Sequence, residues 1–248
     1  MSIDIARIHA LCFDLDGTLS DTDDRMVARL ARQLRPFRGL LFGRTPEYAA
    51  RRLVMGIETP GNFFLGLTDR LDLDEPLNRV SELLNRLRAN SMPDTFWMVP
   101  GVYEALAALQ PHFPMAVVSA RDERTCLAFL EQYGLGKFFT AVATGQTCRH
   151  TKPYPDPILW AAERMRVQPS ECLMTGDTVV DIRAGKAAGA QTVGVLCGFG
   201  EQAELARAAA DLILPSTALL PEVLLPSGKQ PAAGAGALTG ESRAPQTG

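Results

Sequence analysis

Short apolar runs alternate with amphipathic stretches along most of the chain. The runs predict buried strands, and the stretches with apolar residues three or four positions apart predict helices. Strands that alternate with helices indicate a parallel sheet covered on both faces, joined by right-handed crossovers. The pattern therefore predicts a doubly wound α/β fold. The predicted strands are 8–14, 115–119, 138–143, 172–175, 191–196 and 212–214, and the predicted helices are 101–110, 123–133, 156–165, 181–188 and 201–209.

One long segment, 20–99, interrupts this alternation directly after the first strand. It shows helical spacing over 23–34, 45–55 and 77–89 and has no strand pattern. We therefore expect an α-helical cap domain, 20–99, inserted into a core formed by 1–19 and 100–225. The remaining tail, 226–248, is rich in Pro, Gly, Ala and Ser and lacks apolar periodicity, which predicts disorder.

Composition narrows the class of protein. The chain has 248 residues, 46% of them hydrophobic, and a formal net charge of -3, so it can bury a large core and has no bulk positive charge for nucleic acid. No apolar run approaches the ~18 residues of a membrane span, and the first residues do not resemble a signal peptide. Five cysteines without a CxxC pair predict reduced thiols in a cytoplasmic protein. The three histidines have no zinc-ligand spacing relative to them.

The first predicted strand ends in Asp14-Leu15-Asp16-Gly17-Thr18. In extended backbone, residues two positions apart point to the same side, so the two carboxylates can face one site. An acidic turn that closes a strand would also explain the run. Taken alone, this motif suggests a reactive site without establishing one.

Further polar residues follow later predicted strands: Ser119, Lys152, Asp177 and Asp181. In open parallel sheets the active site lies at the carboxyl ends of the strands. Each residue alone has an ordinary explanation, such as a helix N-cap for Ser119, a solvated lysine for Lys152 or a helix N-terminus for Asp181. Together with the acidic motif, they place four carboxylates, a hydroxyl and an ammonium at one edge.

Such a cluster requires a cation, because its formal local charge is about -3 and two like charges about 4 Å apart repel by about 4 kcal/mol at an effective dielectric constant of 20. Oxygen ligands favour Mg²⁺. A carboxylate can form an aspartyl-phosphate, so we expect Asp14 to be the nucleophile. Asp16 would protonate the leaving alcohol and then activate water. Lys152 would neutralise the phosphoryl oxygens, and Ser119 would donate a hydrogen bond to one of them.

In this order the motifs resemble the haloacid dehalogenase superfamily of phosphatases, over about 5–20 and 100–220. The stretches KPYPDP from Lys152, GDT from Gly176 and DIRAGKAAG from Asp181 are similar to its phosphoglycolate phosphatase and bacterial pyrophosphatase branch. The resemblance implies a Rossmann-like core with a helical cap. It also implies that the metal ligands are Asp14, the backbone carbonyl of Asp16 and Asp177, while Asp181 orients the metal's waters or the lysine.

Two places depart from the family pattern. The cap segment 35–69 matches no specificity pattern, and the second motif reads Ser119-Ala120-Arg121, where Asn or Gly often follows the hydroxyl residue. A dehalogenase would need neither Asp16 nor the later aspartates. A phosphonatase would need a cap lysine, and 20–99 contains none.

The sequence does not exclude a sugar-phosphate mutase, because such an enzyme would share the core. The arginine-rich part of the cap could bind a membrane surface or a partner, or could reach an anionic substrate. We expect a Mg²⁺-dependent phosphatase that acts on a small soluble phosphate monoester, with no nucleic-acid or membrane partner. The oligomeric state is left open.

Overall fold

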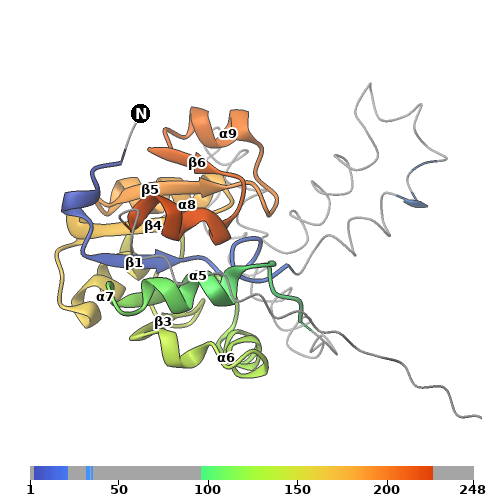
Figure 1. Ribbon diagram of the computed structural model, residues 1–248, viewed down its shortest axis with the longest axis horizontal. Helices are drawn as coiled ribbons and strands as arrows, with labels where there is room; N and C mark the ends of the chain where they lie inside the picture. Colours follow the sequence, from blue (N-terminus) through green and yellow to red (C-terminus); the bar gives the residue numbers. More distant parts are fainter. Residues whose placement is uncertain (1–2, 22–31, 34, 36–95, 226–248) are drawn as a thin grey trace, which may run out of the picture.

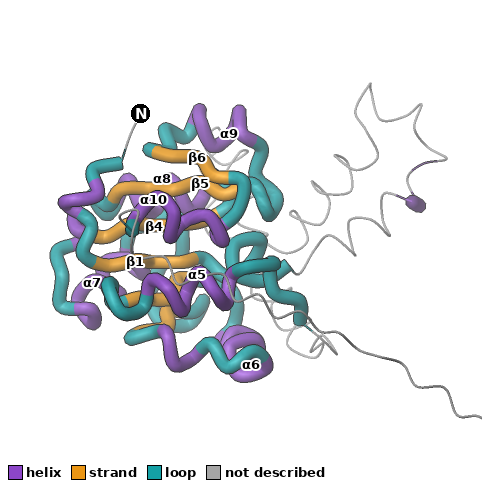
Figure 2. The backbone as a smooth tube through the Cα atoms, in the orientation of Figure 1, coloured by secondary structure: helices purple, strands orange, loops and turns teal. Residues whose placement is uncertain are grey.

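The structure is a computed structural model that describes residues 3–21, 32, 33, 35 and 96–225. Its centre is a six-stranded sheet in the order β3-β2-β1-β4-β5-β6, and every neighbouring pair is parallel. All six predicted strands are present (Figures 1 and 2). The strands are β1 (Ala10–Phe13), β2 (Met115–Val118), β3 (Ala141–Ala143), β4 (Cys172–Gly176), β5 (Gln191–Val195) and β6 (Leu212–Leu214).

Helices connect the strands and flank both faces of the sheet, which confirms the predicted doubly wound α/β fold (Figure 1). The α-helices are α5 (Val102–Leu109), α6 (Glu123–Gln132), α7 (Asp156–Met165), α8 (Val179–Ala187), α9 (Gln202–Arg207) and α10 (Leu220–Leu224). Short 3-10 helices are η1 (Ile5–Arg7), η3 (Gly136–Phe138), η4 (Pro169–Glu171) and η5 (Thr217–Leu219).

The two faces of the sheet bury side chains of different size. Leu11 and Phe13 of β1 point into the larger core cluster, which also contains residues of α5, α6 and α10. Their neighbours Ala10 and Cys12 point to the opposite face and pack with α7. Successive strand residues face opposite sides, so the continuous apolar run in the sequence serves two cores at once. Small residues on the second face let α7 lie close to the sheet.

The structure differs from the predicted elements in several places, of which three have a clear cause. The third strand begins at Ala141 rather than 138, because Phe138 closes η3 and its ring packs edge-on against Tyr103, 5.4 Å between centroids. Helix α8 begins at Val179 rather than 181, because Thr178 caps it. Helix α10 was not predicted; its five residues are too few to show a helical period.

The segment that precedes the predicted cap and the segment that follows it lie side by side. Ser20 forms an antiparallel bridge with Met98, the amide of Asp21 donates to the carbonyl of Trp97 at 2.7 Å, and that of Val99 donates to Leu19 at 3.0 Å. The chain therefore leaves and rejoins the core at one place, just after β1. Apart from residues 32 and 33, the predicted cap helices lie outside the described residues, as do the predicted disordered tail 226–248 and most of the cap arginines.

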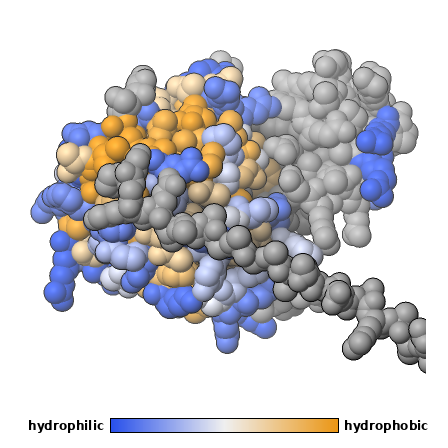
Figure 3. All heavy atoms as spheres, viewed as in Figure 1, coloured by the Kyte–Doolittle hydropathy of each residue, from blue (hydrophilic) through white to orange (hydrophobic). Residues whose placement is uncertain are grey.

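The surface of the core, its cysteines and the length of its helices are three further features of the described residues. Figure 3 shows apolar residues gathered around β6 and α10 on one face, bordered by polar ones. None of the five cysteines is in a disulfide, and Cys12, Cys126 and Cys172 are buried. No helix within the described ranges is long and apolar enough to cross a membrane.

Candidate active site

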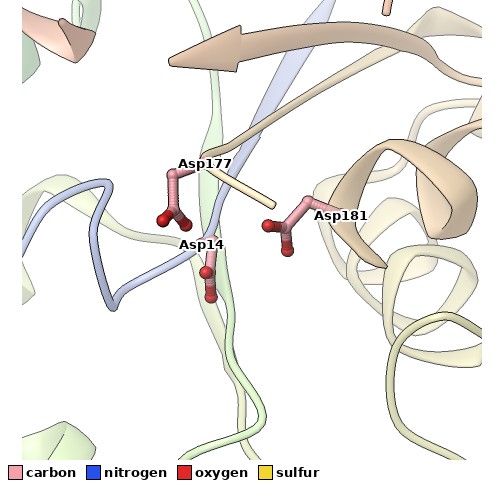
Figure 4. Close-up of side chains that lie close together, drawn as sticks. All are labelled: Asp14, Asp177 and Asp181. Atoms are coloured by element: carbon pink, nitrogen blue, oxygen red, sulfur yellow. The ribbon is translucent and has the colours of Figure 1, made fainter. Parts of the chain in front are cut away.

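Three buried aspartates meet where the two central strands end. Asp14 directly follows β1, Asp177 directly follows the neighbouring β4, and Asp181 lies in the first turn of α8. Each offers a carboxylate oxygen, and these oxygens all lie within 4.8 Å of one another (Figure 4). From β1 the chain continues to β2 on one side of it in the sheet, and from β4 it continues to β5 on the other side. Doubly wound folds bind ligands where the strand order reverses in this way, between β1 and β4.

Lys152 supplies a positive charge inside this cluster. It lies between β3 and α7, and its Nζ is 2.6 Å from Oδ1 of Asp14 and 2.6 Å from Oδ1 of Asp181. Its side chain is 5% exposed. The structure therefore brings four of the predicted site residues together, and Lys152 bridges two of them.

Burial and charge compete at these groups. Burial, together with the nearby charge of Asp181, raises the pKa of Asp14 to about 7 although Lys152 opposes the shift. Burial and the charges of Asp181 and Asp14 also raise the pKa of Asp177 well above its ordinary value. Burial would lower the pKa of Lys152, but Asp14 and Asp181 raise it above its ordinary range. One ammonium is thus not enough to balance the three carboxylates.

Asp177 is held by one oxygen and leaves the other available. Its Oδ2 accepts a hydrogen bond from the amide of Phe199 at 2.7 Å, whereas its buried Oδ1 has no hydrogen-bond partner in the described structure. Gly17 and Gly198 pack against this carboxylate so closely that a Cβ on either would lie within 2.3 Å of Oδ2. Gly17 also has a φ of 70°, which favours glycine.

The donor set fits a divalent metal ion. Three buried carboxylates with one lysine carry a formal charge of about -2 when ionised, and an oxygen of Asp177 lacks a partner. Hard oxygen ligands suit Mg²⁺. Asp14, Asp177 and Asp181 could therefore hold such an ion.

Asp181 has a second, structural contact besides Lys152. Its Oδ2 accepts hydrogen bonds from the amide and the hydroxyl of Thr178, at 3.0 and 2.7 Å, and so closes a capping box at the start of α8. The carboxylate is thereby fixed in direction, with its other oxygen turned to Lys152. Asp181 therefore both caps the first turn of α8 and fixes the position of the Lys152 ammonium.

Ser119 and Asp16 lie in contact with a residue that the sequence analysis did not assign to the site. Ser119, buried just after β2, accepts a hydrogen bond from the amide of Arg121 at 3.1 Å. The guanidinium of Arg121 binds Asp16 through two nitrogens, with Nε donating to Oδ2 at 3.1 Å and Nη2 contacting Oδ1. In the second motif the departure from the family pattern is at Ala120, directly after Ser119, so the sequence carried no direct signal for Arg121.

The comparisons with known proteins agree with this geometry. The model of a family described as haloacid dehalogenase-like hydrolase matches residues 11–195. A phosphoglycolate phosphatase from Escherichia coli (strain K12) is 30% identical, over 88% of this chain and 94% of that protein. One from Vibrio vulnificus (strain YJ016) is 29% identical, over 89% and 98%.

Solved structures share the fold. That of a predicted phosphoglycolate phosphatase from Haemophilus somnus has a TM-score of 0.62 at 20% identity, over 88% of this chain and 98% of that chain. That of a candidate beta-phosphoglucomutase from Thermotoga maritima has a TM-score of 0.58 at 22% identity, over the same shares. With the family match covering most of the chain, this protein belongs to the haloacid dehalogenase-like hydrolases, and the prediction of a phosphatase of that family is confirmed.

Proposed function

We propose that this chain is a Mg²⁺-dependent phosphatase that hydrolyses a small phosphate monoester through an aspartyl-phosphate on Asp14. The observation that carries the proposal is the contact of 2.6 Å between Oδ1 of Asp14 and Nζ of Lys152, inside a cluster of buried carboxylates. This arrangement gives one carboxylate an adjacent cation. A nucleophile that must approach a phosphate dianion requires such charge neutralisation.

The steps follow from the side chains. An oxygen of Asp14 attacks phosphorus, the bond from phosphorus to the ester oxygen breaks, and Asp16 gives its proton to the departing alkoxide. A water then attacks the phosphorus of the aspartyl-phosphate and passes a proton to Asp16. The bond from phosphorus to the oxygen of Asp14 breaks, so inorganic phosphate leaves and the carboxylate of Asp14 is regenerated. Lys152 neutralises the phosphoryl oxygens, and the hydroxyl of Ser119 donates to one of them.

A metal ion has a defined place in this scheme. Asp14, Asp177 and the backbone carbonyl of Asp16 would hold Mg²⁺, and Asp181 completes the cluster of carboxylates around it. The bound ion would supply positive charge for the phosphoryl group and for the ionised form of Asp14. Asp181 would act mainly by orienting Lys152 and water, because its two oxygens already contact Lys152 and Thr178.

The substrate class comes from the relatives. The curated relatives, which match this chain over nearly their whole length, are named phosphoglycolate phosphatases. A small phosphate monoester such as 2-phosphoglycolate is therefore the first substrate to test. The predicted cap, 20–99, would select among such esters, and its arginines could bind an anionic substituent of the substrate.

A sugar-phosphate mutase is the second candidate. It would use the same nucleophile and the same acid–base, and the candidate beta-phosphoglucomutase from Thermotoga maritima shares the fold. The two are separated by the product, since a phosphatase releases inorganic phosphate and a mutase returns an isomeric ester. A cap that binds a membrane or a partner would instead be detected by flotation with anionic liposomes.

The test uses the purified chain with p-nitrophenyl phosphate and 2-phosphoglycolate in Mg²⁺. We expect release of inorganic phosphate, its loss in EDTA, its recovery when Mg²⁺ is restored in excess, and its loss in Asp14→Asn. Glu163→Gln is a suitable control, because that side chain is 82% exposed. Normal turnover by Asp14→Asn would show that the mechanism is wrong.

A further inference from the structure

Arg121 contacts both carboxylate oxygens of Asp16. Nε and Nη2 of the guanidinium reach different oxygens of Asp16, in the forked geometry that arginine forms with carboxylates. The side chain of Arg121 is 13% exposed and that of Asp16 is 31% exposed. A forked pair that is mostly removed from water restricts rotation of the carboxylate more than one surface contact would.

The position of Arg121 is itself fixed by its surroundings. Its amide donates to Oγ of Ser119 at 3.1 Å, and its guanidinium lies 5.3 Å from the centre of the Phe96 ring. Phe96 lies near the end of the predicted cap segment, 20–99, and is the first residue of the described range 96–225, where the chain rejoins the core. The arginine thus joins the end of β2, the acidic motif after β1 and the returning chain.

Phe96 has little freedom to move away. Its carbonyl accepts hydrogen bonds from Nε2 of Gln132 at 2.9 Å and from the hydroxyl of Tyr133 at 2.8 Å. Its amide donates to Oε1 of Gln132 at 3.3 Å, and its buried ring packs edge-on against Phe129, 6.0 Å between centroids. Phe96, whose ring the Arg121 guanidinium contacts, is therefore held against the C-terminal end of α6.

We propose that Arg121 is a positioning residue for Asp16, the acid–base of the proposed reaction, on which this inference rests. The fork contacts both carboxylate oxygens, and each oxygen has more than one lone pair, so the fork does not by itself prevent Asp16 from carrying the proton that moves to the leaving group. Without Arg121, the carboxylate of Asp16 loses the two contacts of the fork, and proton transfer loses the alignment that they provide.

This role predicts a dependence on the leaving group. p-Nitrophenolate departs with little help from an acid, whereas the alkoxide of 2-phosphoglycolate needs a proton. Loss of alignment at Asp16 therefore slows the alkyl ester more than the aryl ester. A merely destabilised protein slows both equally, because the fraction of folded enzyme cancels in their ratio.

The experiment compares kcat/KM for the two esters in wild type, Arg121→Met and Arg121→Lys, and uses Arg124→Met, an exposed arginine of the neighbouring helix α6, as the matched control. We expect Arg121→Met to lower kcat/KM roughly tenfold more for 2-phosphoglycolate than for p-nitrophenyl phosphate, a part of the ~10²–10⁴-fold that an acid–base supplies. Arg121→Lys keeps the charge without the fork and should fall between. An equal loss on both esters would overturn the proposal.

A double-mutant cycle gives a second, independent test. In an Asp16→Asn background, Arg121→Met should slow hydrolysis of p-nitrophenyl phosphate less than about twofold, since the group that Arg121 aligns is already gone. A loss as large as in wild type would mean that Arg121 acts on the substrate instead, and would overturn the inference alone. Wild-type enzyme that releases phosphate from neither ester would overturn the proposed function and this inference with it.

Discussion

Lys152 lies against Asp14 at 2.6 Å, with the ammonium buried between this carboxylate and that of Asp181. The contact gives Lys152 two tasks. It neutralises charge during phosphoryl transfer, and it stabilises a cluster of like charges that could not otherwise be buried. Removing it should therefore affect both activity and stability.

We predict that Lys152→Met lowers kcat by about 10²-fold or more, the usual cost of removing one donor to a developing charge. In EDTA at pH 8 it should also lower the free energy of unfolding by about 3–5 kcal/mol, because two buried carboxylates lose their partner. Urea denaturation and steady-state kinetics measure the two effects separately.

Lys186→Met is the control for this change. Lys186 pairs with Asp211 at 2.5 Å, but its side chain is 36% exposed and the pair lies away from the aspartate cluster. We expect it to change stability by about 1 kcal/mol at most and to leave kcat intact. Similar losses in both variants would argue against a special role for Lys152.

The raised pKa of Asp14 predicts an unusual dependence of stability on pH. Its pKa is about 7 in the folded protein without metal and 3.8 ordinarily, mainly through burial. Between these values the unfolded chain has released the proton that the folded chain retains. Stability contributed by this group is therefore full below about pH 4 and is lost as the pH rises to about 7, in total about 4 kcal/mol.

The test is urea denaturation in EDTA from pH 4 to pH 8. Asp14→Asn, which cannot ionise, should be more stable than wild type at pH 8, and the difference should shrink toward pH 4. Saturating Mg²⁺ at pH 8 should stabilise wild type more than Asp14→Asn, because the ionised carboxylate binds the ion. If the stability gap between wild type and Asp14→Asn does not change with pH, Asp14 does not have the raised pKa.

Much of the fold and the outline of the site could be predicted from the sequence. The strands are continuous apolar runs, and a parallel sheet carries the residues after its strands to one edge. That rule places Asp14 after β1 and Asp177 after β4 at the same edge, and the pairing of β1 with β4 in the structure makes them neighbours. Asp181 and Lys152 follow from the same reasoning, since each comes soon after a strand.

The pairing of Asp16 with Arg121 could not be predicted in this way. It depends on the lengths of two loops and on the contact of Arg121 with the ring of Phe96, a residue that lies in the predicted cap segment. The late start of β3 has a similar cause, because the ring of Phe138 finds a partner in Tyr103 and not in the sheet. Both are tertiary contacts that no local pattern records.

The glycine beside Asp177 supports a final prediction about metal affinity. A Cβ on Gly198 would lie 2.2 Å from Oδ2 of Asp177 and 2.6 Å from the Cα of Gly17. Neither contact is possible, so Gly198→Ala must shift the carboxylate or the loop that binds it through Phe199. Changes that disturb the support of a metal ligand typically weaken binding about 10–100-fold.

We therefore expect Gly198→Ala to raise the Mg²⁺ concentration for half-maximal activity at least about tenfold. It should also reduce the increase in Tm that Mg²⁺ produces, a readout that does not need turnover. Gly136→Ala is the matched control, because its Cβ would meet nothing within 4 Å and Gly136 lies in η3. If Gly198→Ala kept the wild-type response to Mg²⁺ in both measurements, Asp177 would not be a metal ligand held by this loop, and the cation would have to be bound by the other carboxylates.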